Sequence, residues 1–465
     1  MRVPLKIAEK LNSWTWGVYI PRYGRFLKTN NRRMTLMHIA VVVIIAMPLA
    51  VFFTNCDDMS NSSAGPISDS SGLYSNDYVA LGTVVLKLNE SGEVEWEKNL
   101  YQLGHKTLCS VVVASDGFIA VGQVVAKFNF DGELVWEKNL NPSGVMYGSV
   151  TAVSDGFVCV SSNFSDKGNI IFTKFSNEGE LIWQRNFVSE NAVYFNSIAT
   201  VQGGVVAVGG SLISGPTMVK YDDNGNKIWE KNKLTFLFNS GSYSSIVAVP
   251  DGFVTVDGGS DSYSLGTNGE KIRKNAATLE KYDNDGNTIW IKTFDSSGAD
   301  KLISVTAVPD GYIAVGAVFS SAFGNGAWSD NQGRGGETDA LIVKFDINGN
   351  PIWWKNFGGA SMDQFDSITA VPNGVIAVGG SYPESFGNGD WTGVDAKRHG
   401  GMLAEADIIA VNYDYSGNVI WAHNYNGPSY LYDLFIFMWV IILILVIIFI
   451  LIVVAVLFRK GKLHT

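Results

Sequence analysis

The sequence has few cysteines and few prolines. Its 465 residues include three cysteines, Cys56, Cys109 and Cys159, and 12 prolines beside 50 glycines. Three cysteines provide neither a disulfide framework nor the ligand spacing of a metal site. We therefore expect Cys109 and Cys159 to be buried free thiols, with a bridge between them as the alternative in an oxidising compartment. Scarce proline and abundant glycine favour a chain of many short strands and turns.

Recognisable catalytic motifs are also absent. The sequence contains no G-x-S-x-G elbow, no H-E-x-x-H helix, no phosphate-binding loop and no dinucleotide glycine fingerprint. The turns "DDNGN" at Asp222 and "DNDGN" at Asp283 do not fit calcium loops, because lysine falls where the first and twelfth ligands would stand. We therefore expect no metal, no cofactor and no enzymatic activity.

Negative charge exceeds positive charge between the two ends of the chain. The formal net charge is −10, and the basic residues cluster near both termini, which leaves the middle of the chain more acidic than the average. Nucleic acid is therefore not an expected partner.

What the sequence does contain is one phrase repeated seven times. In "LIVKFDINGNPIWWKNFGG", Leu341 to Gly359, a lysine precedes a turn rich in Asn and Gly, and a tryptophan follows nine residues after the lysine. The seven tryptophans are Trp96, Trp136, Trp183, Trp229, Trp290, Trp353 and Trp421. Their lysines are Lys87, Lys127, Lys174, Lys220, Lys281 and Lys344, with Asn412 in the last copy. A second phrase, "SITAVPNGVIAVGG" at Ser367, precedes six copies in similar form and survives as "YVALG" before the first.

Each phrase has the pattern of a β-hairpin, since apolar and β-branched residues flank a cluster of turn residues. Two hairpins per repeat give four short antiparallel strands, which is the pattern of a propeller blade. The sequence therefore predicts an all-β protein, a seven-bladed β-propeller of four-stranded antiparallel blades over residues 77–426. Closure with six or eight blades stays open, because the first copy lacks a recognisable first strand.

The repeated side chains have expected structural roles in such a ring. Each tryptophan is expected to dock against the neighbouring blade, which would bury about 150–250 Å² per ring. The lysines are expected to extend along a blade edge with their charge in water. The seven tryptophans therefore form a predicted structural ring.

The repeats resemble two known families. "KFDINGNPIW", from Lys344, is similar to the repeat of quinoprotein dehydrogenases, but Asp346 and Gly349 are three residues apart rather than four, and no vicinal cysteine pair is present. This resemblance implies the blade architecture and no quinone site. The segment Asp339 to Gly359 followed by Ser367 to Gly380 is more similar to bacterial surface β-propeller repeat proteins. That resemblance implies an exported, envelope-associated propeller.

Two long apolar runs flank the repeats. Residues 434–458 carry no charge and are long enough to cross a hydrocarbon core of about 30 Å. Basic residues follow this run and precede the apolar run at 36–53. Positively charged flanks stay in the cytoplasm. Both runs therefore predict an integral protein of the cell membrane, with the propeller on the extracytoplasmic side.

The expected organisation therefore has six parts. They are a basic cytoplasmic segment at 1–35, a transmembrane signal anchor or signal peptide at 36–53, a Ser/Gly-rich linker at 54–76, the propeller at 77–426, a transmembrane helix at 434–458 and a basic cytoplasmic tail at 459–465. Lipidation at Cys56 is an alternative for the first attachment, although Phe53 and Asn55 differ from a usual lipobox.

Function is expected where the repeat is interrupted. The second and third strands are joined by long inserts in the last three repeats, at 260–277, 319–338 and 382–406, and two inserts share the phrases "AFGNGAW" and "SFGNGDW". Inserts on consecutive blades can build one binding surface. The exposed ligand-binding residues predicted on them are Trp328, Asp330, Arg334, Asp390, Trp391, Arg398 and His399. The alternative is that both tryptophans turn inward and hold their own loops.

These features predict an extracytoplasmic binding or adhesion module for a protein or polysaccharide. In antiparallel blades, the inserts lie on the same face as the links that join the fourth strand of one blade to the first strand of the next. The C-terminal apolar run begins close to this face. We therefore expect a membrane-proximal partner. An envelope scaffold that works through its helices, and a quinoprotein-like or polysaccharide-active enzyme, are the two alternatives.

Overall fold

The computed structural model describes most of the repeat region. The described residues are 78–81, 84–99, 108–138, 146–162, 169–188, 193–211, 215–233, 242–257, 262–265, 271–274, 277–294, 300–319, 338–397 and 406–425. The predicted membrane segments at 36–53 and 434–458, the linker and both cytoplasmic segments lie outside them. Within these ranges, no helix is long and apolar enough to cross a membrane.

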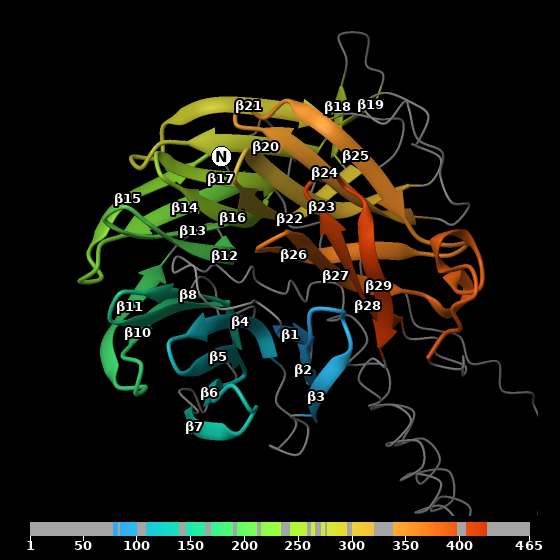
Figure 1. Ribbon diagram of the computed structural model, residues 1–465. Coiled ribbons are helices and arrows are strands. Elements are labelled where there is room, and N and C mark those ends of the chain that lie inside the picture. The colour runs from blue at the N-terminus through green and yellow to red at the C-terminus, as the bar shows by residue number, and fades with distance from the viewer. Residues whose placement is uncertain are drawn as a thin grey trace, which may run out of the picture. The chain divides into compact units, whose positions relative to one another are not determined.

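Six four-stranded antiparallel sheets form the blades of a propeller, with the first strand of each blade near the centre and the fourth at the rim (Figure 1). The blades are β4 (Leu108–Ala114), β5 (Gly117–Gly122), β6 (Val125–Phe128) and β7 (Leu134–Lys138); β8 (Met146–Val153), β9 (Gly156–Ser162), β10 (Asn169–Phe175) and β11 (Leu181–Val188); β12 (Val193–Val201), β13 (Gly204–Ser211), β14 (Gly215–Tyr221) and β15 (Lys227–Asn232); β16 (Tyr243–Val249), β17 (Gly252–Asp257), β20 (Ala277–Tyr282) and β21 (Thr288–Phe294); β22 (Asp300–Val308), β23 (Gly311–Phe319), β24 (Thr338–Asp346) and β25 (Pro351–Phe357); and β26 (Asp363–Val371), β27 (Gly374–Ser381), β28 (Asp407–Asp414) and β29 (Val419–Tyr425). The predicted all-β propeller of four-stranded antiparallel blades is confirmed.

Two smaller sheets accompany the blades. The strands β1 (Tyr78–Leu81), β2 (Val84–Leu88) and β3 (Val94–Asn99) form a three-stranded sheet in the described residues. The strands β18 (Ser262–Leu265) and β19 (Lys271–Lys274) form a separate hairpin within the insert between β17 and β20. The sequence pattern did not predict this hairpin.

The hairpin turns follow from their polar residues. In the turn between β24 and β25, the Asp346 carboxylate accepts the backbone N–H groups of Asn348 and Asn350 at 2.9 and 2.8 Å. Gly349 has a φ of +74°, a backbone conformation that is energetically unfavourable for a residue with a side chain. The Asx and Gly positions of the repeat are therefore turn determinants.

Each repeat tryptophan lies against the turn glycine of the next sheet. The ring of Trp183, for example, lies 2.8 Å from where a Cβ of Gly225 would be, and its indole nitrogen donates to the carbonyl of Asp223 at 3.0 Å. The seven pairs are Trp96 with Gly132, Trp136 with Gly179, Trp183 with Gly225, Trp229 with Gly286, Trp290 with Gly349, Trp353 with Gly417 and Trp421 with Gly92. Only glycine leaves room for the indole, so the two residues are needed together.

The last blade contacts the three-stranded sheet through three side chains of β29. The Trp421 indole donates to the carbonyl of Glu90 at 2.9 Å, and the Tyr425 hydroxyl donates to that of Gly92 at 2.6 Å. Between them, His423 Nε2 lies 3.0 Å from the carbonyl of Ser91. The three-stranded sheet therefore lies between the last four-stranded blade and the first.

Four of the repeat lysines are buried and do not extend into water, which corrects the expectation drawn from the sequence. Lys344 is buried, forms a 2.8 Å ion pair with Asp310 and donates to the carbonyl of Tyr415 at 3.1 Å. The same role recurs at Lys127 with Asp116 and Asn177, Lys174 with Asp155 and Asp223, and Lys220 with the carbonyls of Gln202 and Asn284. A buried ammonium needs such partners, and these join a turn of its own blade to a turn of the next blade.

Cys109 and Cys159 are both free thiols. Cys159 is fully buried, and its sulfur lies 3.5 Å from the carbonyl oxygen of Thr173. Burial raises the pKa of the Cys109 thiol to about 11. The bridge between them does not form in this structure.

We predict that Trp183→Ala destabilises the propeller, because it removes an aromatic contact between two blades. The ring is 7% exposed, and truncation of a buried aromatic residue costs about 3–5 kcal/mol. Ile182→Ala is the matched control, since this neighbour is 47% exposed and should cost less than about 1 kcal/mol. Urea denaturation followed by tryptophan fluorescence and circular dichroism would measure both. Equal losses would contradict a docking role for the indole.

Candidate functional site

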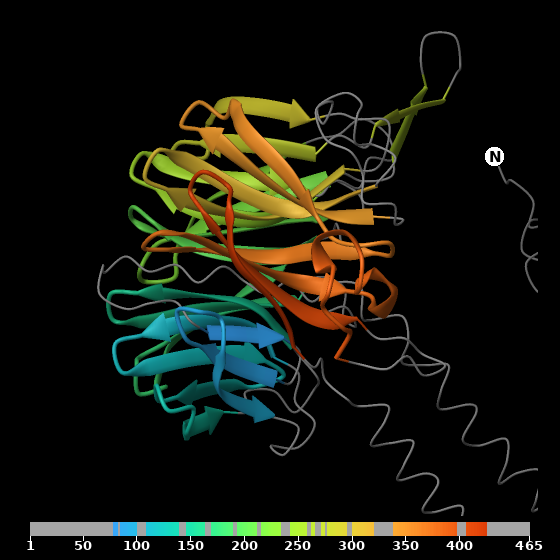
Figure 2. The same cartoon turned by 45° about the vertical axis from the view of Figure 1, so that its right-hand side comes forward.

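The insert of the last blade is the insert that the structure describes best. Between β27 and β28 it forms two 3-10 turns, η5 (Pro383–Ser385) and η6 (Gly389–Trp391), which project on one face of the propeller (Figure 2). Backbone hydrogen bonds join it to the link between β25 and β26, since Tyr382 donates to Met362 at 3.0 Å and Asp390 donates to Gly358 at 2.9 Å. The insert and this link therefore lie on the same face, as the sequence predicted.

Trp391 is fully buried beneath this insert. Its ring lies 5.0 Å from the rings of Phe357 and Phe386, and it belongs to the hydrophobic core between the last two blades. The prediction of an exposed Trp391 is therefore wrong. The alternative is correct for Trp391: its side chain turns inward and holds its own loop. Packing against two phenylalanine rings stabilises the indole more than exposure to water would.

A buried carboxylate fixes the same insert from below. Asp363 accepts the N–H of Gly359 at 2.8 Å and the hydroxyl of Ser385 at 2.9 Å, and it also accepts the hydroxyl of Ser381. Burial raises the pKa of Asp363, although these donors oppose the shift. No side chain fits at Gly359, where a Cβ would lie 1.9 Å from the carbonyl of Ser385. The first part of the insert, residues 382–391, is therefore held by specific contacts.

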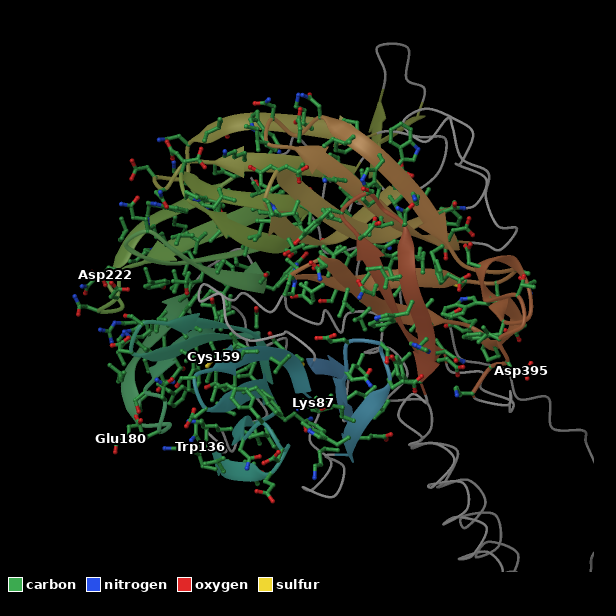
Figure 3. All side chains as sticks on the ribbon, in the orientation of Figure 1. Lys87, Trp136, Cys159, Glu180, Asp222 and Asp395 are labelled. Carbon is green, nitrogen blue, oxygen red and sulfur yellow. The ribbon has the colours of Figure 1, made fainter. Side chains whose placement is uncertain are left out.

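The outward face of the insert is polar and mostly acidic. Asp390 is exposed, although one of its carboxylate oxygens accepts the N–H of Gly358 at 3.1 Å. The other exposed polar groups are Glu384, Thr392, Asp395 and Lys397, and Figure 3 labels Asp395. We call these five residues the insert surface. The predicted site residues Trp328, Asp330, Arg334, Arg398 and His399 lie outside the described residues.

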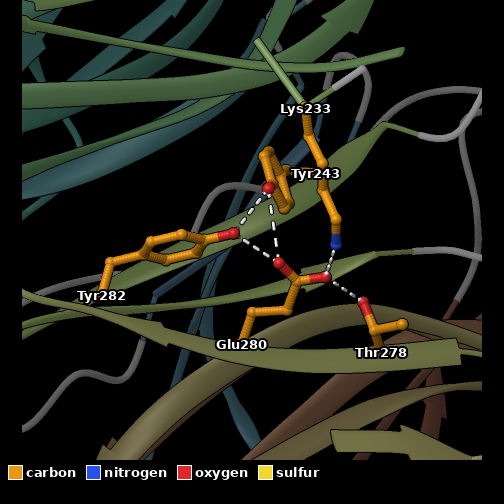
Figure 4. Close-up of polar contacts among 5 residues, drawn as sticks. All are labelled: Lys233, Tyr243, Thr278, Glu280 and Tyr282. Atoms are coloured by element: carbon orange, nitrogen blue, oxygen red, sulfur yellow. Dashed lines mark hydrogen bonds and ion pairs between the residues drawn. The ribbon is translucent and has the colours of Figure 1, made fainter. Parts of the chain in front are cut away.

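A second polar cluster lies between two blades and was missed by the sequence reasoning (Figure 4). The carboxylate of Glu280 on β20 is fully buried and forms a 2.5 Å ion pair with Lys233, which follows β15. The Thr278 hydroxyl donates to it at 3.0 Å, and the Tyr282 hydroxyl also donates to it. The hydroxyl of Tyr243 lies 2.7 Å from that of Tyr282. Every oxygen of the carboxylate therefore has a partner.

Burial also changes the ionisation of the two phenols in this cluster. It raises the pKa of Tyr243 and that of Tyr282, and the Glu280 carboxylate raises both further by charge repulsion. Both hydroxyls therefore remain protonated and able to donate hydrogen bonds.

The repeat shows how unusual this cluster is. At the position of Glu280 the other copies carry Leu86, Ala126, Thr173, Val219, Val343 and Val411. At the position of Lys233 they carry Leu100, Leu140, Phe187, Phe294, Phe357 and Tyr425. One junction has therefore exchanged two mostly apolar positions for an ion pair. Comparing the copies position by position would have revealed it, because acid and base change together.

The innermost strands share a bulge that faces the axis of the ring. In all six blades the pairing register shifts by one residue just before a serine. These serines are buried and face the neighbouring blade; Ser149, for example, accepts the N–H of Ile198 at 3.2 Å. The bulged residues are half-buried: Cys109, Gly148, Asn196, Ser244, Ile303 and Asp366. Because they lie on the innermost strands, the solvent that reaches them is at the axis. We call them the axial ring.

The blades, their tryptophan contacts and their repeat define a β-propeller repeat protein with quinoprotein-like blades. The family model described as outer membrane protein assembly factor BamB matches residues 81–270. The regulatory protein FlaEY of Caulobacter vibrioides is 27% identical over 164 residues, which cover 34% of this chain and 17% of that protein. A solved structure titled "Structure of Dos1 propeller" is similar with a TM-score of 0.41 and 11% identity, over 74% of each chain. The chain thus spans about a sixth of the length of its curated relative.

We predict that the Lys233 and Glu280 substitutions are strongly coupled. Lys233→Leu alone leaves a buried carboxylate without its counter-ion and should cost about 3–5 kcal/mol. Adding Glu280→Val restores the apolar residues of the other repeats and should recover most of this loss. Chemical denaturation of the two single variants and the double variant gives the coupling energy.

The control for this cycle is the exposed ion pair of Lys227 and Glu230, whose charged atoms are 2.9 Å apart. Lys227→Leu should change the free energy of unfolding by less than about 1 kcal/mol. Additive effects of Lys233→Leu and Glu280→Val would contradict the assigned pairing.

Proposed function

We propose that this protein is a binding scaffold of the cell envelope, and that the insert surface of the last blade binds a protein partner with basic groups. The single observation that carries this proposal is the fixed insert, which buries Trp391 and Asp363 and leaves Glu384, Asp390 and Asp395 exposed beside Lys397. A loop held in one conformation loses little entropy when it binds. Among the described residues of the insert, three carboxylates against one ammonium favour a positively charged partner.

The comparisons support an assembly or regulatory setting for such a scaffold. The matching family model is described as an outer membrane assembly factor, and the curated relative is named a regulatory protein. Neither description requires chemistry by the propeller, so we propose a non-enzymatic role with no cofactor. Polysaccharide as the ligand of the insert surface is the second candidate, because exposed carboxylates and hydroxyls can also bind sugars.

We further propose that the propeller is extracytoplasmic and anchored to the membrane by residues 434–458, which are uncharged and begin nine residues after β29 ends. The insert surface would then face a membrane-proximal partner. A scaffold that works only through its apolar segments is the alternative, and it differs by not needing the insert surface.

We also propose that the three-stranded sheet is the first of seven blades. "YVALGTVVLK" from Tyr78 aligns with "FIAVGQVVAK" from Phe118, and the same offset of 40 places Ser70 where Ser110 stands on the innermost strand β4. Asn76 then takes the place of Asp116, the partner of Lys127. Residues 68–74 would supply the fourth strand.

We predict that Leu73→Pro lowers the thermal midpoint of the full-length chain by several degrees, because proline interrupts the strand proposed for residues 68–74. Ala64→Pro is the control, since residue 64 precedes the segment proposed as the strand. Differential scanning calorimetry in detergent compares the two. A midpoint that Leu73→Pro leaves unchanged would mean that the first sheet gains no strand from this segment.

Site-specific photo-cross-linking in intact cells tests the insert surface. We predict that a photoreactive residue at Thr392 gives a discrete protein adduct, whereas one at the exposed turn residue Asp223 does not. Glu384→Lys with Asp395→Lys should reduce the adduct at least fivefold, because both carboxylates become ammonium groups. Asp131→Lys with Asp223→Lys changes the charge equally among the exposed turns and should leave the Thr392 adduct unchanged.

Two results of the cross-linking and one of a membrane extraction would count against the proposal. Equal adducts from Thr392 and Asp223 would remove the insert surface as the binding face. An adduct that survives the charge reversal would remove the basic partner. Full-length protein released from the membrane fraction by alkaline carbonate would remove the anchor.

A further inference from the structure

The axial ring contains one charged side chain among its six members. Asp366 is bulged on β26, while the equivalent positions carry thiol, amide, hydroxyl and uncharged groups. Among the described residues, Gln364 is the hydrogen-bond donor to the Asp366 carboxylate, through Oδ1. Oδ2 has no such donor in these ranges. This oxygen of a half-buried carboxylate is therefore available to a cation that approaches along the axis.

Two amides on the innermost strands, Gln364 on β26 and Asn196 on β12, present acceptors as well. Gln364 uses its NH₂ group on Asp366, and Asn196 uses its NH₂ group on the carbonyl of Tyr243 at 2.9 Å. The carbonyl oxygens of both amides are then free to accept. Burial raises the pKa of Asp366 to about 6. The axis therefore offers a carboxylate and amide oxygens, which match a ligand rich in N–H donors.

We propose that Asp366 binds the cationic head of a ligand, an alkylammonium or guanidinium group, that enters along the axis of the propeller. Gln364 orients the carboxylate, and its own carbonyl oxygen accepts a second N–H of the head. The site requires the fold alone, and it stands even if the insert surface binds nothing. The competing occupant within the chain is Lys301, which is exposed on the innermost strand β22 of the adjacent blade.

Thermal shift titration of the full-length protein with n-butylammonium chloride tests this site at constant ionic strength. We expect the unfolding midpoint to rise with the amine in the wild-type chain and not with n-butanol, which has the same alkyl chain without charge. Asp366→Asn should abolish the rise, and Asp131→Asn, which removes an exposed turn carboxylate, should not. The midpoint of Asp366→Asn without amine confirms that this variant is folded.

Lys301→Met distinguishes an external cation from the internal one. If the site accepts an external head, wild type and Lys301→Met respond within twofold of each other. A response that appears only in Lys301→Met would overturn the proposal, because Lys301 would then be the group that Asp366 holds. Equal responses of wild type and Asp366→Asn would also overturn it.

A second probe identifies the source of the cation. A response to acetyl-lysine N-methylamide that matches the response to butylammonium assigns the head to a protein side chain. A response to butylammonium alone assigns it to a free amine. Both support the shared chemistry, and the absence of any response refutes it.

Discussion

The contact between a tryptophan and a turn glycine is the constraint on which the propeller depends. A four-stranded antiparallel sheet has two faces, and both must be covered by neighbouring sheets. The indole of Trp353 covers the turn at Gly417, and the indole of Trp421 covers the turn at Gly92, so the same contact that joins consecutive blades also joins the last blade to the first sheet. The ring then closes without a special device. The buried lysines add directional bonds at the same junctions, and a lysine cannot shift without leaving its ammonium unpaired.

This constraint separates positions that can vary from positions that cannot. At a turn glycine, the indole that lies on it excludes any side chain. In the apolar layer between blades, packing restricts the size and polarity of the side chain. The exchange of apolar residues for Lys233 and Glu280 is therefore informative, since a buried ion pair is no more stable than the apolar pair it replaces. It does make this junction different from the other four between consecutive four-stranded blades. Because Lys233 and Glu280 need each other, this pair favours contact between these two blades over contact with any other blade, and so helps to specify the order of the blades.

Much of this arrangement could be predicted from the sequence, because the repeat contains it. The spacing from Lys344 to Trp353 specified a strand, a turn and a second strand, and the tryptophan was correctly expected to face the next blade. The burial of the lysines could not be predicted from one repeat. Within its own blade, such a lysine has a single partner, an aspartate on another turn. The carbonyl that completes its environment belongs to the next blade. Trp391 was ambiguous for the same reason, since Phe357, one of its two aromatic neighbours, comes from the preceding blade.

The two proposed binding surfaces arise at the positions that the ring leaves unconstrained. The bulge leaves one residue of each innermost strand half-buried, outside the apolar layer between blades, so Asp366 can differ from Ile303 without any change in that layer. The insert begins where β27 ends, beyond the last residue that pairs with β28, so its length is free. Its conformation is nevertheless fixed, because Trp391 and Asp363 bind it to the frame. In such a ring, the residues that differ from repeat to repeat, at the axis and on one face, can recognise a partner. Binding at either surface leaves the contacts of the frame intact, and the propeller can therefore act as a rigid support for both.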